Sequence, residues 1–563
     1  MSASLSPALL MIFGSLAAPL LRGWLRAAWL LALPVAAGAW LALAPAGEYG
    51  QFAYAGLELT PVRIDRWSRL FGLVFMLAAA LSVIYALHVK HWVEPVAGLI
   101  YAGAALGAVL AGDLLTLFVY WELTAVSSVF LIWQRRTERA CRAGLRYLLI
   151  QLLSGVLLLV AAAVWYRQTG SLRFDHIGLE GAAGWLLFVA FGIKCAFPLL
   201  HNWLQDAYPE ATESGTVFLS AFTTKLAVYA LARGFSGTEA LIWIGATMTA
   251  FPIFYAVIEN DLRRVLAYSL NNQLGFMVVG IGIGTELALN GAAAHAFAHI
   301  LYKALLFMSM GAVLLRAGTV KGSDLGGLYK SMPWTTGFCI VGAASISAFP
   351  LFSGFVTKSM ILSAAAAEGH LLTWLVLLFA SAGVFHHSGI KIPYFAFFGH
   401  DSGKRCKEAP GNMLVAMAIA ATLCIGIGVY PAPLYAMLPF PVDYAPYTGW
   451  HVLAQLQLLV FSALAFSVLM WHRIYPPELR SVNLDSDWIY RALGPALTRV
   501  GARVRGAVRA PVAVRLDALA AGAARRIERH REAQGTLART WPTGSMVLWV
   551  AIMLASYLVI YYL

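Results

Sequence analysis

Apolar runs of about 20 residues recur along almost the whole chain, and short polar loops separate them. Each run is long enough to cross roughly 30 Å of hydrocarbon as an α-helix. Helices are expected because a lipid-exposed backbone must satisfy its own hydrogen bonds, and the alternating pattern of a membrane barrel is absent. The composition agrees, since 60% of the 563 residues are hydrophobic and only 12% are charged. The sequence therefore predicts an all-α polytopic membrane protein.

The runs correspond to about 14–16 transmembrane helices, depending on whether neighbouring short runs merge. They lie near 5–22, 27–46, 69–88, 93–112, 113–133, 142–166, 183–201, 212–233, 238–258, 264–286, 290–316, 335–365, 371–398, 411–431, 450–471 and 545–563. No basic stretch precedes the first run, so we expect a membrane helix there rather than a cleaved signal.

The net charge of +13 comes mainly from arginines and lysines in short loops between the runs. Cytoplasmic loops collect these residues, so the charge indicates topology rather than binding to nucleic acid. The most basic loop, residues 135–146, follows the fifth run and is expected in the cytoplasm. If successive runs alternate in direction across the membrane, four more basic groups lie on the cytoplasmic side: Arg263/Arg264, Lys321/Lys330, Lys404/Arg405/Lys407 and Arg473/Arg480. The N-terminus and the segments 46–66 and 431–449 are then expected outside.

Motifs for cofactors and covalent chemistry are lacking. The five cysteines (Cys141, Cys195, Cys339, Cys406 and Cys424) show no CxxC or paired spacing. Neither a disulfide framework nor an iron–sulfur or haem site is therefore expected. The glycines at 280, 282 and 284 lack the strand–turn–helix context of a dinucleotide site, and residues 399–405 have the wrong spacing for a P-loop. We expect no cofactor, no metal site and no catalytic residue in this chain.

Residues 485–540 differ from the rest, because arginines alternate there with Ala, Val and Leu. Such a mixture predicts an amphipathic helix on the cytoplasmic surface, with its arginines toward lipid headgroups or a partner protein. Pro511 is expected to kink or divide this helix. The alternative is a surface-bound connector that leads to the final span.

Ionisable residues stand in the middle of five of the apolar runs: Glu122, Lys194, Lys225, Lys303 and Lys358. Each costs several kcal/mol at bilayer depth and is a functional candidate by default. Any single one could be a structural tie between helices, but five on five helices indicate a path for protons. Burial disfavours the charged form of a lysine, and a carboxylate partner restores it, so a changing partner can drive proton uptake and release. Glu122 and Lys194 are the natural pair, with Lys225 the next acceptor.

Two further candidates, His295 and His299, lie on the same run as Lys303, at spacings of four residues. Residues four apart share a helix face, so these side chains form a stripe along which protons can pass. The alternative is that each histidine only hydrogen-bonds a neighbouring helix. A metal site is not expected, because no carboxylate or cysteine shares the stripe. The neighbours His386 and His387 point in different directions and extend the path only as a weaker hypothesis.

The tetrapeptide Ala-Phe-Pro-Leu occurs twice, at 196–199 after Lys194 and at 348–351 before Lys358. Proline interrupts helical hydrogen bonding, so both spans are expected to break at depth. Matching interruptions in two halves of a transporter often mark its binding site. The shared tetrapeptide therefore suggests an internal repeat.

Six segments together resemble the antiporter-like membrane subunits of respiratory complex I and of Mrp-type cation/proton antiporters, most closely the Mrp D subunit. They are DLLTLFVYWEL (113–123), KCAFPLLHNWLQDAYPEA (194–211), SGTVFLSAFTTKLAVYALAR (214–233), ENDLRRVLAYSLNNQLGF (259–276), HAFAHILYKALLFMSMGAV (295–313) and FPLFSGFVTKSMIL (349–362). The resemblance covers roughly 70–470 and implies two inverted five-helix repeats with broken helices. By motif, Glu122 and Lys194 resemble the family's ion pair and Lys225 its half-channel lysine. Lys303 resembles the central lysine and Lys358 the exit residue.

Three departures from the family pattern stand out. Asn271-Asn272-Gln273 occupies a place where many relatives carry a histidine or serine. Lys391, in HHSGIKIPYFAFFG (386–399), stands where an arginine-bearing pattern is expected and can substitute for it. The basic segment and final span resemble the extension of the largest complex I antiporter-like subunit.

The chain is expected to consist of N-terminal helices (1–90), two repeats (91–235 and 236–400), C-terminal helices (401–475), a basic surface segment (476–540) and a final helix (541–563).

The resemblance implies a proton-translocating subunit that works with other membrane subunits in the bacterial cytoplasmic membrane. Three functions remain open: a multisubunit Na+/H+ antiporter, a proton-pumping subunit of a complex I-like redox-driven complex, and a proton-coupled subunit of an inorganic-carbon uptake complex. Only in the second would the chain belong to an enzyme, as a translocase subunit. Protons, and Na+ in the first case, would be the transported ions.

Overall fold

The computed structural model describes residues 6–479, 483–489, 491–503, 521–522, 525–526, 528 and 543–562. The chain forms two units, Met1–Asn483 and Leu484–Leu563. In the second unit, residues 491–503 are helical and α22 spans Thr543–Tyr562. Most of the expected basic segment, including Pro511 and the arginines at 505, 509, 515, 529 and 531, lies outside the described residues.

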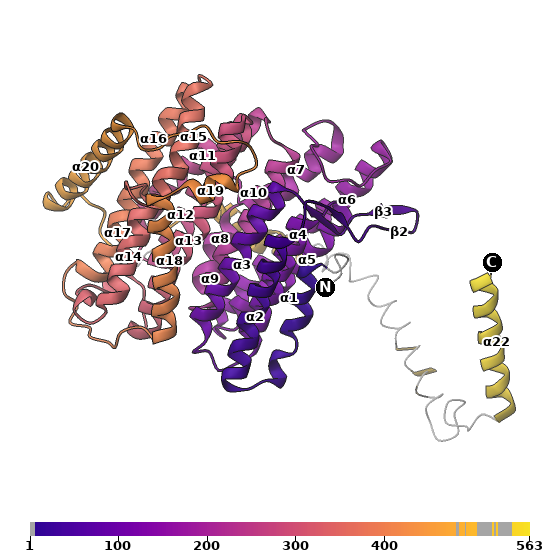
Figure 1. Ribbon diagram of the computed structural model, residues 1–563. Helices are drawn as coiled ribbons and strands as arrows, with labels where there is room; N and C mark the ends of the chain where they lie inside the picture. The colour runs from indigo at the N-terminus through magenta and orange to yellow at the C-terminus, as the bar shows by residue number, and fades with distance from the viewer. Residues whose placement is uncertain are drawn as a thin grey trace. The chain divides into compact units, whose positions relative to one another are not determined.

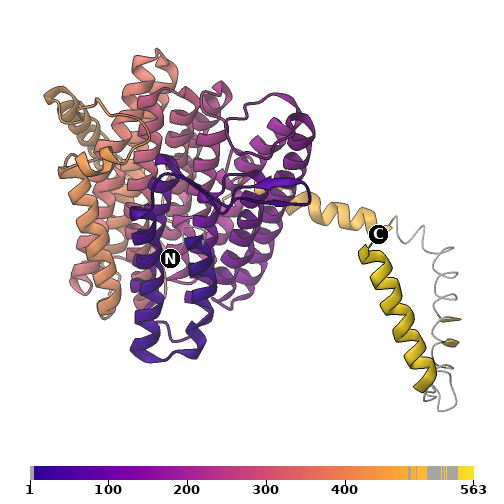
Figure 2. The same cartoon turned by 45° about the vertical axis from the view of Figure 1, so that its right-hand side comes forward.

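Helices make up nearly all of the first unit, and they run side by side in Figures 1 and 2. They are α1 (Pro7–Ser15), α2 (Gly23–Leu43), α3 (Arg66–Ala86), α4 (Val93–Leu110), α5 (Leu114–Trp133), α6 (Glu138–Thr169), α7 (Gly181–Cys195), α8 (Asn202–Ala207), α9 (Gly215–Ala221), α10 (Thr223–Gly234), α11 (Glu239–Ile258), α12 (Leu262–Ile283), α13 (Glu286–Ala317), α14 (Pro333–Ile346), α15 (Ser353–Ala367), α16 (Leu371–Val384), α17 (Lys391–Pro393), α18 (Gly411–Val429), α19 (Ala432–Ala436) and α20 (Gly449–Trp471). Short 3₁₀ turns occur at η1 (Ala18–Leu20), η2 (Tyr208–Glu210), η3 (Gly322–Asp324) and η4 (Leu328–Lys330), and π-helical turns at η5 (Phe385–Ile390) and η6 (Tyr394–Phe398).

Among the described residues, 11 helices are long and apolar enough to cross a membrane. Three more apolar helices are shorter: Pro7–Leu20, Gly181–Cys195 and Ser545–Leu558. The expected span 183–201 is helical only as far as Cys195, at the end of α7, and the expected spans 212–233 and 335–365 are divided between α9 and α10 and between α14 and α15. The prediction of an all-α polytopic membrane protein is confirmed.

The two Ala-Phe-Pro-Leu segments break their helices in the same way. Ala196 and Leu199 have φ of 61° and 69°, and Ala348 and Leu351 have φ of 56° and 74°. Phe197 N donates to Gly192 O at 3.0 Å, and Phe349 N donates to Ala344 O at the same distance. L-residues adopt these left-handed angles at a cost, so two identical breaks strengthen the case for an internal repeat.

The loop before α3 contains two small antiparallel ladders that the sequence did not predict. Strand β1 (Gly47–Tyr49) pairs with β4 (Val62–Ile64), and β2 (Phe52–Tyr54) pairs with β3 (Leu57–Leu59). Ala55 and Gly56, at the tip, both have positive φ, as a tight hairpin turn requires. Strands of three residues are too short to show a period in the sequence.

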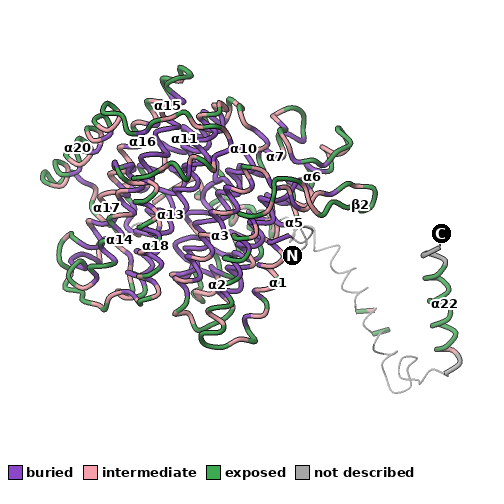
Figure 3. Tube along the Cα trace, in the orientation of Figure 1, coloured by how far each residue is buried: buried purple, intermediate pink, exposed green. Residues whose placement is uncertain are grey.

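Helix α13 forms the centre of the first unit. It packs against α3, α9, α12, α14, α15 and α18, and Figure 3 shows it among buried segments. Nearly every side chain from Ala288 to Leu314 is buried. A polar side chain on α13 can therefore reach helices from both halves of the unit.

Candidate functional site

Lys194 lies at the end of α7 and inserts its side chain against α5. Its Nζ donates to Trp121 O at 2.6 Å and to Thr124 Oγ1 at 2.9 Å, and lies 4.4 Å from the centre of the Trp121 ring. Glu122 points instead toward α6, where its carboxylate lies against Gly155 and its Oε1 has no hydrogen-bond partner among the described residues. The charges of Glu122 and Lys194 interact electrostatically. The two groups of the expected pair thus interact electrostatically, while the carboxylate is turned toward α6 and the ammonium toward α5.

Lys225 stands just after the break between α9 and α10. The helix is interrupted at Phe222, and the Lys225 Nζ donates to Ser220 O at 2.6 Å. A cation at the C-terminal end of α9 is favoured by the unpaired carbonyls there. Lys225 also lies close enough to Cys195, next to Lys194, for electrostatic interaction. The break therefore brings Lys225 toward the end of α7.

On α13, His299 and Lys303 are fully buried, and their side-chain nitrogens have no hydrogen-bond partner among the described residues. Lys303 interacts electrostatically with Lys225, and His299 with both Lys225 and Lys358. Buried donors and acceptors in proteins are normally satisfied by protein or ordered water. These nitrogens are therefore suited to contact water between the two halves.

His295, one turn before His299, hydrogen-bonds two neighbouring helices, which is the alternative that the sequence left open for the histidines. Its Nδ1 lies 3.1 Å from Thr357 Oγ1, and its Nε2 lies 3.1 Å from Gln273 Oε1. Tyr302 also donates to Gln273 Oε1, at 3.1 Å. Gln273 belongs to the polar stretch at 271–273 that departs from the family pattern, and this was the signal available in the sequence.

Lys358 lies on α15 after the second break. Its Nζ donates to Ile346 O at 3.1 Å, at the C-terminal end of α14, and lies 4.9 Å from the centre of the Phe276 ring. Lys225 and Lys358 therefore have the same local setting, because each ammonium caps a carbonyl at a helix break. The sequence predicted the break but not this contact.

The weaker candidates lie where α16 continues into π-helical turns. His387 Nδ1 lies 2.8 Å from Ser388 Oγ, which donates to Ser269 Oγ of α12 at 2.7 Å. The His386 ring faces the other way, with its centre 5.5 Å from that of Tyr475. The two histidines therefore point in different directions, as expected. Turns of π-helix are frequent at functional sites.

Lys391 is buried between the two π-helical turns and binds the end of α11. Its Nζ donates to Ala256 O at 3.1 Å, Val257 O at 2.6 Å and Glu259 O at 2.7 Å. It also lies 2.9 Å from Glu478 Oε1. A carboxylate partner for Lys391 was not predicted from the sequence.

Two of the basic loops that were expected on one side, residues 135–146 and the loop at Arg263, contact the same segment in the structure. Arg135 donates to Pro209 O at 2.6 Å, and Arg139 pairs with Glu210 at 2.8 Å. Arg263 is fully buried and donates to Pro209 O and Ala211 O at 3.0 and 3.1 Å. These basic residues thus converge on the segment that follows α8.

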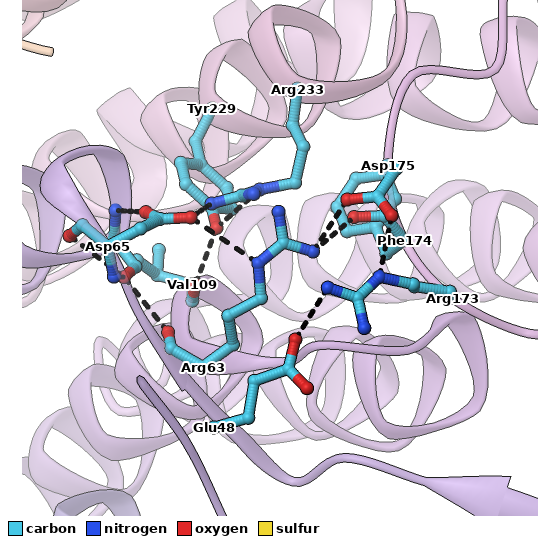
Figure 4. A network of polar contacts seen from close by, with 10 residues as sticks. Glu48, Arg63, Asp65, Val109, Arg173, Phe174, Asp175, Tyr229 and Arg233 are labelled. Atoms are coloured by element: carbon cyan, nitrogen blue, oxygen red, sulfur yellow. Dashed lines mark hydrogen bonds and ion pairs between the residues drawn. The ribbon is translucent and has the colours of Figure 1, made fainter. Parts of the chain in front are cut away.

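Near the C-terminal end of α10, ion pairs join the helices to the segment that contains the β-ladders (Figure 4). Arg233 pairs with Asp65 at 2.7 Å, Arg63 with Asp175 at 2.8 Å, and Arg173 with Glu48 at 2.7 Å. Burial raises the pKa of Asp65, but Arg233, the Ser68 N–H and Arg63 outweigh it, so the pKa lies below its ordinary value. Asp65 is therefore ionised and ties the start of α3 to the end of α10.

The candidate residues together form a series of protonatable groups among the packed helices. Electrostatic interactions link Lys225 to Lys303 and His299, His299 to Lys358, and His387 to Lys303 and Lys391. Glu122 and Lys194 interact with each other in the same way. Within the described part of the chain, no three His, Cys, Asp or Glu side chains gather as a metal site. Each group in this series can bind and release a proton.

Comparisons with known proteins agree with this geometry. Residues 111–385 match the model of the NADH:quinone oxidoreductase/Mrp antiporter transmembrane family. The chain is 29% identical to the D component of the Na(+)/H(+) antiporter of Alkalihalophilus pseudofirmus, over 67% of this chain and 85% of that protein. It is 30% identical to the N component of the NADH-quinone oxidoreductase of Desulforudis audaxviator, over 59% of this chain and 72% of that protein.

Among solved structures, a chain of the membrane-bound sulfane sulfur reductase, an archaeal respiratory membrane complex, superposes with a TM-score of 0.71. The match covers 98% of this chain and 99% of that chain at 23% identity, so it supports the fold alone. The sequence matches, the paired helix breaks and the buried lysines lead to one assignment. The chain belongs to the family of transmembrane subunits shared by NADH:quinone oxidoreductases and Mrp antiporters.

Proposed function

We propose that this chain is the proton-translocating subunit of a multisubunit Na+/H+ antiporter. The observation that carries the proposal is the buried series of Lys225, Lys303 and His299, placed between two identical helix breaks. A buried ammonium costs several kcal/mol, and such groups in membrane proteins mark ion pathways. The similarity to the D component of a Na(+)/H(+) antiporter supports the choice of ion.

Each residue has a distinct role in the proposal. Glu122 changes the charge beside Lys194, which favours or disfavours the protonated form of that lysine. Lys194 and Lys225 exchange a proton across the break at 196–199, since Lys225 lies beside Cys195. Lys303 and His299 pass it to the second half, where Lys358 and His295 receive it. His386, His387 and Lys391 continue the path.

Moving one charge through 100 mV involves about 2.3 kcal/mol. A change in partner that shifts a pKa by under about two units supplies this free energy. Small movements of Glu122 relative to Lys194 are therefore sufficient to gate transfer. No large rearrangement is required.

The protein is expected to lie in a bacterial cytoplasmic membrane, with its N-terminus outside and other membrane subunits as partners. The meeting of the loops that contain Arg135, Arg139 and Arg263 supports this orientation, because basic loops favour the cytoplasm. Partner subunits are expected because the similar proteins are named as subunits of antiporters or oxidoreductases.

A second candidate function is proton pumping in a redox-driven complex. It is favoured by the 30% identity to the N component of the NADH-quinone oxidoreductase of Desulforudis audaxviator. The response of the proton gradient to sodium distinguishes the two functions. In inverted membrane vesicles with an imposed ΔpH, added NaCl should dissipate the gradient if the complex is an antiporter. A gradient that ignores sodium but forms on addition of a reductant would support the second function instead.

A further inference from the structure

Glu478 is a buried carboxylate that the path described above does not include. It follows α20, in the connector formed by residues 472–479, and its side chain is only 6% exposed. Lys391 is fully buried and lies 2.9 Å from Glu478 Oε1. Apart from this ion pair, neither carboxylate oxygen has a hydrogen-bond partner among the described residues. A carboxylate with free acceptor sites in such a place needs an explanation.

The connector is folded so that Glu478 turns back toward the helices. Arg473 has φ of 56°, and the N–H groups of Ile474 and Tyr475 both donate to Leu469 O, at 2.9 and 3.1 Å. Pro476 and Pro477 follow directly and restrict the backbone before Glu478. The buried position of the carboxylate is therefore built into the end of α20.

Lys391 has hydrogen-bond acceptors besides Glu478. Three carbonyls at the end of α11 already accept from its ammonium, at 2.6 to 3.1 Å, and an ammonium has three protons to donate. The carboxylate is thus a surplus acceptor beside a saturated cation. Protonation of Glu478 would leave Lys391 fully hydrogen-bonded.

The carboxylate also lies next to the end of the proposed path. Lys391 interacts electrostatically with His387, and His387 with Lys303. The rings of His386 and Tyr475 are in contact, and the His386 Nε2 and Tyr475 hydroxyl have no partner in the described chain. Tyr475 in turn interacts with Glu478. Two routes therefore converge on this carboxylate.

Other charged groups set the properties of Glu478. Glu259 lies close enough to interact with it, and is itself 3.8 Å from Arg264 and accepts from Asn483 at 3.2 Å. Burial raises the pKa of Glu478, Lys391 opposes the rise, and Glu259 adds to it, so the pKa lies above its ordinary value of 4.5. A carboxyl of this kind can exchange a proton closer to neutral pH than an exposed one.

We propose, resting on the proposed function, that Glu478 is the terminal proton-carrying residue of the path, at the end where the basic loops lie. A protonated His386 or His387 gives up a proton, and an O–H bond forms on Glu478 as the N–H bond breaks. The neutral carboxyl separates from Lys391. Its O–H bond then breaks, the proton passes to water, and the carboxylate pairs with Lys391 again. No proton is gained or lost in the cycle.

The alternative is that the ion pair only ties the connector to α11, and two single variants separate the two roles. Glu478→Gln keeps an oxygen that can accept from Lys391 but has no carboxyl to carry a proton, whereas Glu478→Asp keeps a carboxyl. A structural tie predicts that proton flux falls only as far as thermal stability falls in each variant. A proton-carrying role predicts that Glu478→Gln loses flux whatever its stability, and that Glu478→Asp retains part of it.

The experiment measures proton flux by a fluorescent pH probe in inverted membrane vesicles that contain the complex with its native partners, alongside the thermal unfolding of each variant. Glu368→Gln, at an exposed position, is the matched control and should retain wild-type flux. We expect Glu478→Gln to lose flux by at least about 100-fold, in line with removal of a proton-transfer group, and Glu478→Asp to retain more flux than Glu478→Gln. Wild-type flux in Glu478→Gln would overturn the role of Glu478 alone. Absence of flux in the wild-type vesicles would overturn the proposed function itself.

Discussion

The carboxylate of Glu122 lies directly against Gly155 of α6, where an added Cβ would overlap its Oε1 atom. Glycine at 155 therefore provides the space into which Glu122 turns, away from Lys194. The side chain of Glu122 is flexible, so a larger residue at 155 would displace the carboxylate rather than break the helix packing. The position of the acid relative to the lysine is thus set by a residue on a third helix.

Gly155→Ala should lower proton flux while leaving the protein folded, because it moves Glu122 without removing any charge. Alanine in a helix interior also raises helix stability by about 1 kcal/mol relative to glycine. Gly426→Ala on α18 is the matched control, since nothing lies within 4 Å of a Cβ added there. Equal flux in both variants would show that the position of Glu122 has no role in gating.

Gln273→Leu should destabilise the second half of the helical unit. Gln273 Oε1 accepts from Tyr302 and pairs with His295 Nε2, both at 3.1 Å. Losing this oxygen leaves a buried polar group unsatisfied, at a cost of about 1–3 kcal/mol. Thermal unfolding in detergent checks the prediction, with Gln273→Glu as a variant that keeps an acceptor. An unchanged unfolding temperature for Gln273→Leu would mean that solvent replaces the lost contact.

The breaks at the two Ala-Phe-Pro-Leu segments predict a contrast between substitutions at the same residue. Ala196 and Ala348 adopt left-handed angles, which cost L-residues about 1–2 kcal/mol and β-branched residues more. Ala196→Val and Ala348→Val should therefore lower the unfolding temperature. Ala196→Gly and Ala348→Gly should not, because glycine accepts positive φ freely. If valine and glycine behave alike, the left-handed geometry is incorrect.

The ion pairs at the outer end of α10 predict that stability falls in acid. The pKa of Asp65 and that of Asp175 lie below their ordinary value of 3.8, because burial, which raises both, is outweighed by neighbouring arginines. A carboxyl whose pKa is lower in the folded protein than in the unfolded chain stabilises the fold at pH values above its ordinary pKa. This contribution is lost as the pH falls through the pKa of the folded state. The unfolding temperature should therefore drop below pH 3.8, and Asp65→Asn should reduce the drop. A flat profile in both proteins would contradict this.

The sequence was sufficient to predict the helical membrane fold and the two breaks, because hydrophobic runs and proline act locally. It also predicted that Lys225, Lys303 and His299 would be buried among the packed helices, because polar side chains in apolar membrane runs rarely face lipid. It did not predict the contacts of these residues. Each candidate lysine except Lys303 donates to a backbone carbonyl, and helix packing, rather than residue type, decides which carbonyl is available.

Glu478 could not be selected from the sequence either. A carboxylate in a loop after the last core helix normally lies in solvent, so its position along the chain offered no reason to select it. Its burial depends on the left-handed turn at Arg473 and on Lys391, which lies far earlier in the chain. The small ladders at 47–64 were missed for a related reason, because three-residue strands have no detectable period.

Proton flux through Lys225→Met, in vesicles that contain the intact complex, is the sharpest test of the proposed path. Lys225 is fully buried, and its ammonium donates only to Ser220 O among the hydrogen bonds of the described chain. Lys330→Met, which removes an exposed lysine paired with Asp401, is the matched control. We expect loss of flux by at least about 100-fold for Lys225→Met and wild-type flux for Lys330→Met. Wild-type flux through Lys225→Met, with the protein inserted and folded, would contradict proton transfer along the buried lysines.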